Sequence, residues 1–412
     1  MDTIKKNLTD TGKLAVSFFK WLFISAVTGL VAGGVGILFS KGLSLVNGFR
    51  GEHPELILGL PVAGIIIVTI YKLAKFNDKG TNLVLSAERG NDSVPFRMAP
   101  LIFVSTLLTH LTGGSAGREG AALQLGGSVA GLLGSIFKLD KNDKRIIITC
   151  GMSAGFAAVF GTPLAAAVFA LEVAIAGSMQ YAAFLPCMVS SLVASSFAKF
   201  AGCHAEHFEI TQSVDFDIRS ALIIALLGIL CAFVGMFFSG SLHLSHKWIE
   251  KLLPNPYIRI VVGSAVIILL TIVLKTTAYS GAGTNLIEAA FEGEAPKIAF
   301  LLKIIFTSIT LGVGFKGGEI VPTLCIGATF GCLFGLIAGL PPSLCAAVGM
   351  VSVFCAVTNC PIASLMLSFE LFGFENMKFL FIGIALSFAL SGKGGLYHGQ
   401  GIKSKFSLIQ ED

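Results

Sequence analysis

The stretch GGSAGREG, at residues 113–120, decides what kind of fold this chain can adopt. It places a charged pair, Arg118 and Glu119, among glycines and between two long apolar runs. Glycines leave backbone N–H groups accessible, and a helix that starts here points the positive end of its dipole at the same place. Such a place attracts an anion, and the carboxylate of Glu119 is itself an anion. We therefore expect Glu119 to occupy the site or, once protonated, to leave it.

The composition around this stretch is that of a membrane protein. Of 412 residues, 54% are hydrophobic and 13% are charged, with a mean hydropathy of +0.83, whereas soluble domains carry about 25% charged residues. Backbone in lipid must satisfy its hydrogen bonds internally, and apolar runs such as 221–238 and 258–274 are too long for the alternating strands of a barrel. We predict an all-α polytopic membrane protein embedded in the lipid bilayer. The net charge of +5 comes without a dense basic cluster, which excludes nucleic acid as a partner.

The apolar segments are of two kinds. A membrane span needs about 20 residues, and four segments reach that length with room to tilt: 14–48, 55–75, 219–249 and 257–275. Others are short and interrupted by glycine or proline, namely 80–88, 95–112, 118–136, 163–176, 283–291 and 318–338. Interrupted segments in corresponding places of two halves are typical of the binding site of a transporter.

The two halves of the chain repeat each other. Three pairs of blocks match in the same order: GTNLV at 80–84 with GTNLI at 283–287, GREG at 117–120 with GGEI at 317–320, and 151–172 with 349–370. Ordered matches of this kind indicate an internal duplication with a seam near 201–217. Sequence identity alone does not say whether the repeats are parallel or inverted.

The duplication divides the chain into an N-terminal tail, 1–13, two membrane repeats, 14–210 and 211–400, and a C-terminal tail, 401–412. Basic residues flank both ends, at Lys5, Lys6, Lys13, Lys393, Lys403 and Lys405. The seam instead carries acids, at Glu206, Glu209, Asp215 and Asp217, and no Lys or Arg. Because basic flanks favour the cytoplasm, we expect cytoplasmic termini, an outer seam and a multi-pass protein of the plasma membrane.

A second acid stands at the equivalent place of the second half. Glu319 lies between Gly318 and Pro322, again at a helix start opened by glycine. The proline falls in the first turn, where its missing N–H costs little. Two such starts, one in each repeat, are expected to point at one central site. For Glu119 and Glu319 alike, the alternative is a carboxylate that only caps its own helix.

Five more residues are candidates for a role in transport or for a structural role. Thr81 and Asn82 offer a hydroxyl and an amide to an ion, or else they cap the helix that follows. Tyr397, beyond the last apolar run, donates its phenol to a central anion or anchors the chain at the membrane interface. Glu172 and Glu370 lie inside apolar runs and are either proton relays or buried acids bound by backbone N–H groups.

The motifs of membrane enzymes are missing from the sequence. No HExxH, GxSxG or Walker A motif occurs, which argues against a protease, a lipase or an ATP-driven pump. A membrane-embedded enzyme of another kind needs a nucleophile–base pair or metal ligands within the bilayer, and His110 alone does not supply them. We therefore predict a protein that is not an enzyme, with no metal site and no cofactor.

Over about residues 14–400 the chain resembles the CLC family of anion channels and anion/proton antiporters. GREG at 117–120 matches the family's GREGP motif up to its proline, which is Ala121 here. Residues 318–322 are similar to the family's GxFxP motif, with Ile320 in place of the phenylalanine. The resemblance implies a homodimer with one pore per subunit. It also implies a fold of two inverted repeats with many tilted and broken helices.

The resemblance also assigns a site. GTNLV at 80–84 lies where the family has GSGIP, and Tyr397 lies where a central tyrosine is expected. Glu119 is then the gating glutamate, which competes with the anion and carries the proton. The anion is expected near mid-membrane, among Gly80, Thr81, Asn82, Gly117, Arg118, Gly120, Gly318, Ile320, Val321 and Tyr397.

Two departures are similar to the fluoride/proton antiporter branch of the family. Val173 stands where chloride/proton exchangers carry an inner proton-transfer glutamate. The acid Glu319, beside the anion path, is unusual for proteins that handle chloride. The fluoride branch also alters the GSGIP serine, and either Thr81 or Asn82 takes its place here.

Fluoride is small and strongly hydrated, so a site for it must replace water with strong donors. Glu319 is such a donor when protonated, and it repels every anion when ionised, so it would couple anion entry to proton entry. We expect a fluoride/proton antiporter that exports fluoride from the cytoplasm in exchange for inward protons, with Glu119 and Glu319 as the proton-handling pair. The alternative is a chloride/proton exchanger or a passive chloride channel of the same fold.

Overall fold

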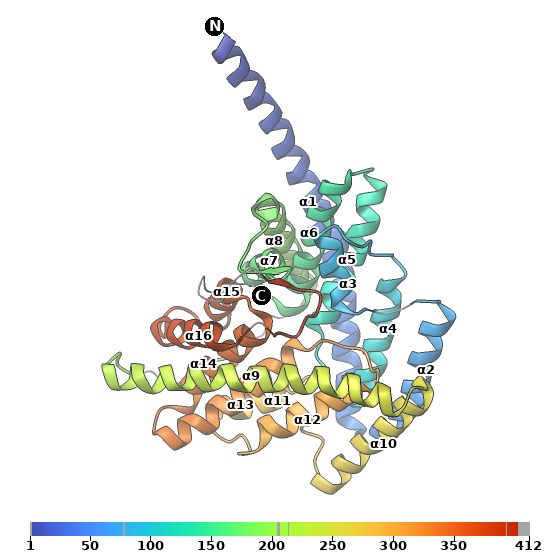
Figure 1. The fold of residues 1–412 in the computed structure, drawn as a ribbon, viewed down its shortest axis with the longest axis vertical. Coiled ribbons are helices and arrows are strands. Elements are labelled where there is room, and N and C mark those ends of the chain that lie inside the picture. The colour runs from blue at the N-terminus through green and yellow to red at the C-terminus, as the bar shows by residue number, and fades with distance from the viewer. Residues whose placement is uncertain (1, 77–78, 204–206, 213, 393, 403–412) are drawn as a thin grey trace.

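The computed structural model describes residues 2–76, 79–203, 207–212, 214–392 and 394–402, and helices dominate this part of the chain (Figure 1). The first half contains α1 (Asp2–Glu52), η1 (Pro54–Gly59), α2 (Leu60–Leu73), α3 (Thr81–Glu88), α4 (Met98–Leu111), α5 (Glu119–Ile136), α6 (Lys141–Phe160), α7 (Pro163–Glu172), β1 (Ile175–Ala176), η2 (Tyr181–Ala183) and α8 (Phe184–Phe200). The second half contains α9 (Ile218–Leu252), α10 (Pro256–Leu274), α11 (Thr284–Glu292), α12 (Ala299–Gly312), α13 (Ile320–Ala338), α14 (Pro342–Thr358), α15 (Pro361–Phe372), α16 (Met377–Leu390) and β2 (Gly401–Ile402). The predicted all-α fold is confirmed.

Helix lengths agree with a membrane protein whose helices are tilted and broken. Six stretches of the described chain are long and apolar enough to cross a membrane: Gly12–Glu52, Pro54–Leu73, Tyr181–Phe200, Ile218–Leu252, Pro256–Leu274 and Ile320–Ala338. Helix α9 has 35 residues and is therefore about 52 Å long. This exceeds a hydrocarbon core of about 30 Å, so α9 must tilt strongly. By contrast, α7 and α15 have only 10 and 12 residues and are too short to cross.

Some predicted boundaries remain predictions. Helix α1 already begins at Asp2, so the stretch 1–13 enters the helix that carries the first apolar run. Its cytoplasmic position and the division of the repeats at 210/211 are untested. Of the predicted C-terminal tail, only β2 lies within the described residues. The basic residues Lys393, Lys403 and Lys405 and the acid Glu206 fall outside them.

Helices α7 and α15 reveal how the two repeats are related. Glu172, at the C-terminal end of α7, accepts two backbone N–H groups from the first turn of α15, at 3.2 and 2.8 Å. Glu370, near the C-terminal end of α15, accepts two from the first turn of α7, at 2.9 and 2.8 Å. Each helix therefore starts where the other ends, so the pair is antiparallel and the repeats are inverted. Both acids bind helix N-termini, so the structural interpretation of Glu172 and Glu370 is the one that the structure supports.

The same symmetry appears in two close helix crossings. Helix α5 packs on α6, and helix α13 packs on α14, with glycines at the points of contact. A Cβ atom at Gly126 would collide with the carbonyl oxygen of Gly151, and one at Gly327 with that of Gly349. Small residues let the backbones approach this closely.

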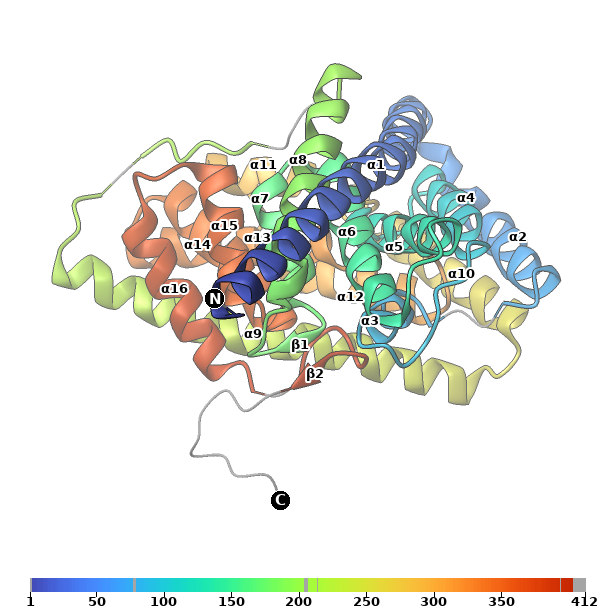
Figure 2. The same ribbon diagram turned by 90° about the horizontal axis from the view of Figure 1, so that it is seen from above.

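Figure 2 shows α14–α16 of the second half at one end of the molecule and α2 and α4 at the other, with α9 running beneath both.

The segment after α16 returns to the centre of the molecule. The backbone N–H of Leu396 donates to the carbonyl of Val357 at 2.8 Å. The side chain of Gln400 donates to the carbonyls of Val173 and Thr358, at 3.0 and 2.7 Å. Strand β2 then pairs in parallel with β1. These bonds hold Tyr397 inside the main core cluster, 5% exposed.

Candidate functional site

The two glycine turns singled out by the sequence meet at the centre of the fold. Gly117 and Gly318 form an antiparallel bridge, with N···O distances of 2.6 and 2.7 Å. A Cβ atom at Gly120 would lie 2.9 Å from the Cα atom of Gly318, so glycine is required for this approach. The bridge brings the N-termini of α5 and α13 together, and their dipoles converge. The prediction that both helix starts point at one place is therefore correct.

Glu119 fills the N-terminal end of α5 with its own charge. Its side chain is fully buried. One carboxylate oxygen accepts the backbone N–H of Arg118 at 3.1 Å, and the other accepts the side-chain Nε of Arg118 at 3.2 Å. Protonation of this carboxyl removes its charge and weakens its hydrogen bonds to both donors. The donors would then be available to a diffusible anion.

A cavity of about 740 Å³ lies on one side of the glycine bridge, and we call it the Tyr397 cavity. Gly80, Thr81, Asn82, Glu319 and Tyr397 all line it. Glu319 stands at the N-cap position of α13, yet its side chain makes no capping hydrogen bond to that helix. The alternative that Glu319 only caps its helix therefore finds no support.

Neither threonine of the repeated GTN turns is an N-cap. That position belongs to Gly80 in α3 and to Gly283 in α11, whose φ angles are 58° and 92°, a region open mainly to glycine. Thr81 is instead the first residue of its helix, and its hydroxyl oxygen accepts the amide of Gln124 at 3.2 Å. The hydroxyl hydrogen of Thr81 thus points away from Gln124.

Asn82 and Tyr397 differ in how their polar atoms are engaged. The side-chain oxygen of Asn82 accepts the backbone N–H of Gly399 at 2.7 Å, which holds the segment that carries Tyr397. The Tyr397 hydroxyl has no hydrogen-bond partner among the described residues. A buried phenol normally has a partner. The hydroxyl of Tyr397 is therefore a donor in need of an acceptor, and the alternative of an interfacial anchor is wrong.

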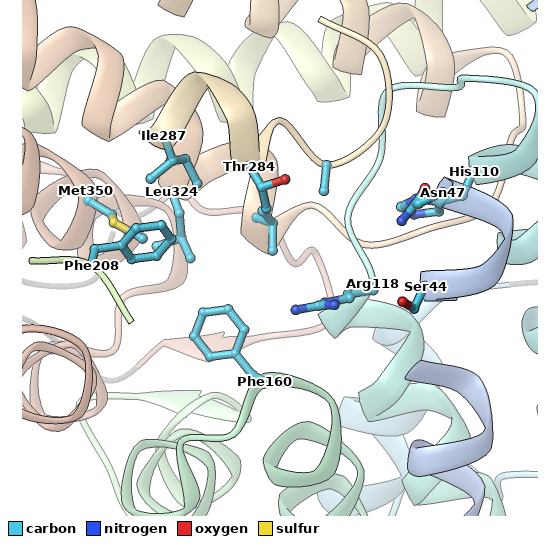
Figure 3. Close-up of a pocket in the computed structure, with 12 residues that line it drawn as sticks. Ser44, Asn47, His110, Arg118, Phe160, Phe208, Thr284, Ile287, Leu324 and Met350 are labelled. Atoms are coloured by element: carbon cyan, nitrogen blue, oxygen red, sulfur yellow. The ribbon is translucent and has the colours of Figure 1, made fainter. Parts of the chain in front are cut away.

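A second cavity, of about 210 Å³, contains the side chain of Arg118, and we call it the Arg118 cavity. His110, Thr284 and Val321 also line it, together with apolar side chains. Figure 3 shows the guanidinium of Arg118 extending between Thr284 and Phe160. Arg118 lines one cavity and Glu319 the other, whereas Glu119 lines neither. The carboxyl of Glu119 is fully buried and bound to Arg118, which itself lines the Arg118 cavity.

The remaining predicted residues contribute backbone. Gly117, Gly120 and Gly318 form the close approach described above. The side chain of Ile320 is fully buried in the main core cluster, so only its backbone is left for an ion.

Two residues were missed by reasoning from the sequence. Gln124 orients the Thr81 hydroxyl across 43 residues of sequence. Lys303 is fully buried in α12, and its ammonium donates to the carbonyls of Tyr279 and Gly281 at 3.2 and 2.8 Å. A lysine inside an apolar run is a signal that the sequence does contain. Nothing local identifies Gln124, because its partner belongs to another helix.

Comparisons with known proteins agree with this geometry. The family model described as voltage gated chloride channel matches residues 63–392. The chain is 36% identical over 389 residues to a chloride/fluoride channel protein from Pseudomonas syringae pv. tomato, with 92% of this chain and 86% of the relative covered. It is 25% identical to the H(+)/Cl(-) exchange transporter ClcA of Vibrio campbellii, with 86% of this chain and 82% of the relative covered.

Solved structures give the same picture. A CLC-type fluoride/proton antiporter has a TM-score of 0.90 at 36% identity, covering 94% of this chain and 98% of that one. A slow cyanobacterial Cl−/H+ antiporter has a TM-score of 0.80 at 20% identity, covering 92% and 96%, and this likeness concerns the fold alone. The family model covers most of the chain, which confirms the resemblance seen in the motifs. The chain therefore belongs to the voltage-gated chloride channel, or CLC, family.

Proposed function

We propose that this protein is a fluoride/proton antiporter. The observation that carries the proposal is the position of Glu319 in one cavity with Thr81 and Tyr397, next to the bridge that holds Glu119. A carboxylate in an anion cavity is unfavourable unless a proton accompanies the anion. The chloride/fluoride channel protein and the fluoride/proton antiporter structure, each 36% identical to this chain, support the same assignment.

The donors around the Tyr397 cavity suit a small, strongly hydrated anion. Thr81 and Tyr397 both line the cavity. The Thr81 hydroxyl accepts a hydrogen bond from Gln124, and the Tyr397 hydroxyl has no partner among the described residues, so both keep a hydrogen to donate. Protonated Glu319 adds a third O–H donor. Hydrogen bonds to a charged acceptor are about twice as strong as neutral ones. Thr81 and Asn82 are the two candidates for the place of the serine in the family's GSGIP motif, and we assign Thr81 to the anion. The side chain of Asn82 instead has a structural role, because its oxygen accepts the N–H of Gly399 and holds the Tyr397 segment.

Glu119 is the group that exchanges places with the anion in this proposal. As a carboxylate it satisfies the donors of Arg118 at the start of α5. A proton that reaches Glu119 from the Arg118 cavity neutralises it and lets an anion take its place. Because Glu319 lies across the Gly117–Gly318 bridge, the proton can pass on toward the Tyr397 cavity as the anion moves the other way. Arg118 supplies the positive charge on the anion's exit side.

The orientation in the membrane belongs to the proposal. We place both termini and the Tyr397 cavity on the cytoplasmic side of the plasma membrane, because basic residues flank the ends of the chain. Phe208, from the acidic seam, lines the Arg118 cavity, so that cavity faces outward. An inward proton gradient then drives fluoride out of the cytoplasm. We also propose a homodimer in which each subunit has its own pair of cavities.

Transport by the purified protein tests this function. Proteoliposomes are loaded with fluoride or chloride, and anion efflux is recorded together with external pH. Fluoride efflux with stoichiometric proton uptake and little chloride movement is the expected result. Chloride efflux with proton movement would instead indicate a chloride/proton exchanger, and chloride efflux without it a passive channel.

The chloride alternative has one specific observation in its favour. A 25% identical relative is named an H(+)/Cl(-) exchange transporter. Against an exchanger of that kind, Val173 is a fully buried apolar residue at the position where the resemblance calls for an inner acid.

A further inference from the structure

Two histidines stack on each other in the wall of the Tyr397 cavity. His243 comes from α9, and His398 directly follows Tyr397 in the returning segment. Their ring centroids are 3.8 Å apart, with an angle of 36° between the ring planes. The pair joins two parts of the chain that are far apart in sequence. It does so at the cavity that also contains Glu319.

The hydrogen bonding of His243 fixes which of its atoms exchanges a proton. Its Nε2 lies 2.7 Å from the carbonyl oxygen of Gly395. A carbonyl only accepts, so Nε2 carries a hydrogen and donates it. The remaining nitrogen, Nδ1, is then the atom of this ring that is left to gain or lose a proton. The same bond fixes the orientation of the ring.

The position of the pair suits proton passage between the cavity and water. His398 is exposed, whereas His243 is partly buried. His398 also lies between Tyr397 and Gly399, and the N–H of Gly399 donates to Asn82 at 2.7 Å. A proton on the pair is therefore close to the anion site at one end and to solvent at the other.

The charges that face the pair are mixed. Among the described residues lining the cavity, the cations are Lys79, Arg89, Lys247 and Lys316, and the acids are Asp92, Glu250 and Glu319, with Tyr397 and His246 as further titratable groups. Lys79 is paired with Asp92 at 3.4 Å, and His246 contacts Glu250 at 4.0 Å. Two imidazolium rings at 3.8 Å repel each other strongly. The pair is thus suited to hold one extra proton at a time and to pass it on.

We propose that the His243–His398 pair is the cytoplasmic proton port of the transporter. The inference rests on the proposed function and adds residues to it. In each cycle the carboxyl of Glu319 gives up its proton, an imidazole nitrogen of the pair takes it, and His398 releases it to water or buffer. No other bond forms or breaks. Val173 has no titratable group with which to transfer a proton at this end of the pathway, and the histidine pair supplies one.

The test compares single substitutions in proteoliposomes. His398→Gln and His243→Gln each remove one titratable ring, and glutamine at 243 can still donate to the carbonyl of Gly395. His53→Gln is the control, since His53 lines neither cavity and contacts Glu55 instead. Fluoride efflux is followed with a fluoride electrode at equal internal and external pH, from 5.5 to 8.

We expect both substitutions in the pair to slow fluoride efflux about tenfold. We also expect them to change how the efflux rate depends on pH, because each removes one titratable ring from the pair. Added imidazole restores the rate of these variants, because a soluble base then accepts the proton. His53→Gln keeps the wild-type rate and pH profile.

Two results would contradict the proposal that the His243–His398 pair is a proton port. Wild-type rates and pH profiles in both variants would mean that the pair takes no part in proton transfer. Slow variants with an unchanged pH profile and no response to imidazole would mean that the rings only shape the Tyr397 segment. Proton uptake by the wild type is measured first. If proton uptake accompanies fluoride efflux and the variants behave like the wild type, the proton port is wrong but the antiporter function holds. If the wild type takes up no protons, the antiporter function itself is wrong.

Discussion

The turns at 117–120 and 317–320 occupy equivalent places in the two repeats, yet their acids lie in different surroundings. Glu119 is fully buried and bound by Arg118, and it lines neither cavity. Glu319 lines the Tyr397 cavity and makes no capping bond to its helix. The acids Glu172 and Glu370, by contrast, make the same bonds in both repeats. Where the symmetry is kept, both acids bind helix N-termini and join the repeats; where it is broken, the two acids have different surroundings, and the proposed function assigns them different roles.

The largest effect is expected from Glu119→Gln. The amide keeps the size of the side chain but cannot ionise, so proton flux should fall to background, a loss of about hundredfold or more. Proton uptake during fluoride efflux measures this. Glu172→Gln is the matched control, because Glu172 is also buried but binds a helix N-terminus. This variant should still take up protons as fluoride leaves, as the wild type does. Unchanged proton flux in Glu119→Gln would contradict the assigned role.

Glu319→Gln comes next. It removes the group that couples anion entry to proton entry, so fluoride turnover should fall about hundredfold. The exposed Glu288 of α11 offers a control, and Glu288→Gln should transport normally. If Glu319→Gln transports fluoride at the wild-type rate, the acids of the two turns are not a functional pair, and the fluoride assignment fails with it.

Gly120→Ala tests whether the close approach of the turns matters. The added Cβ would lie 2.9 Å from the Cα atom of Gly318, so the bridge must open. We expect fluoride turnover to fall about tenfold and the folded state to lose about 1–3 kcal/mol. Gly240→Ala is the control, since nothing lies within 4 Å of its added Cβ. Equal turnover in both variants would show that the bridge tolerates separation.

Tyr397→Phe removes one donor from the Tyr397 cavity. The hydroxyl has no partner among the described residues, so its loss leaves no protein group unsatisfied. Thermal stability should therefore be unchanged, while fluoride binding should weaken about tenfold. Fluoride titration by calorimetry and an unfolding curve in detergent separate the two. A loss of stability without a loss of binding would place the hydroxyl in the structure rather than the site.

The smallest effect on transport is expected from Glu370→Ala. Its two bonds to the first turn of α7 disappear, which should cost about 1–3 kcal/mol and lower the unfolding temperature. The number of protons moved per fluoride should stay at the wild-type value. A changed coupling ratio would mean that this symmetric acid carries protons after all.

Much of the fold was accessible from sequence because its signals are local. Apolar runs, glycine interruptions and the three repeated blocks predicted helices that break near the centre, and the structure has them. The site was accessible for the same reason at Glu119 and Glu319, where an acid follows glycine at a helix start. Gln124, Lys303 and the His243–His398 pair were not singled out, because their roles depend on partners in other helices.

By itself, the sequence determined that this is a duplicated helical membrane protein with an acid at each glycine-opened helix start. Those features follow from composition and from backbone preferences that act over a few residues. The tertiary structure alone decided that the repeats are inverted, that Gly117 meets Gly318, and which acids bind helix N-termini. These contacts join residues about 200 positions apart. Only packing in three dimensions can specify which of many similar acids and glycines come together.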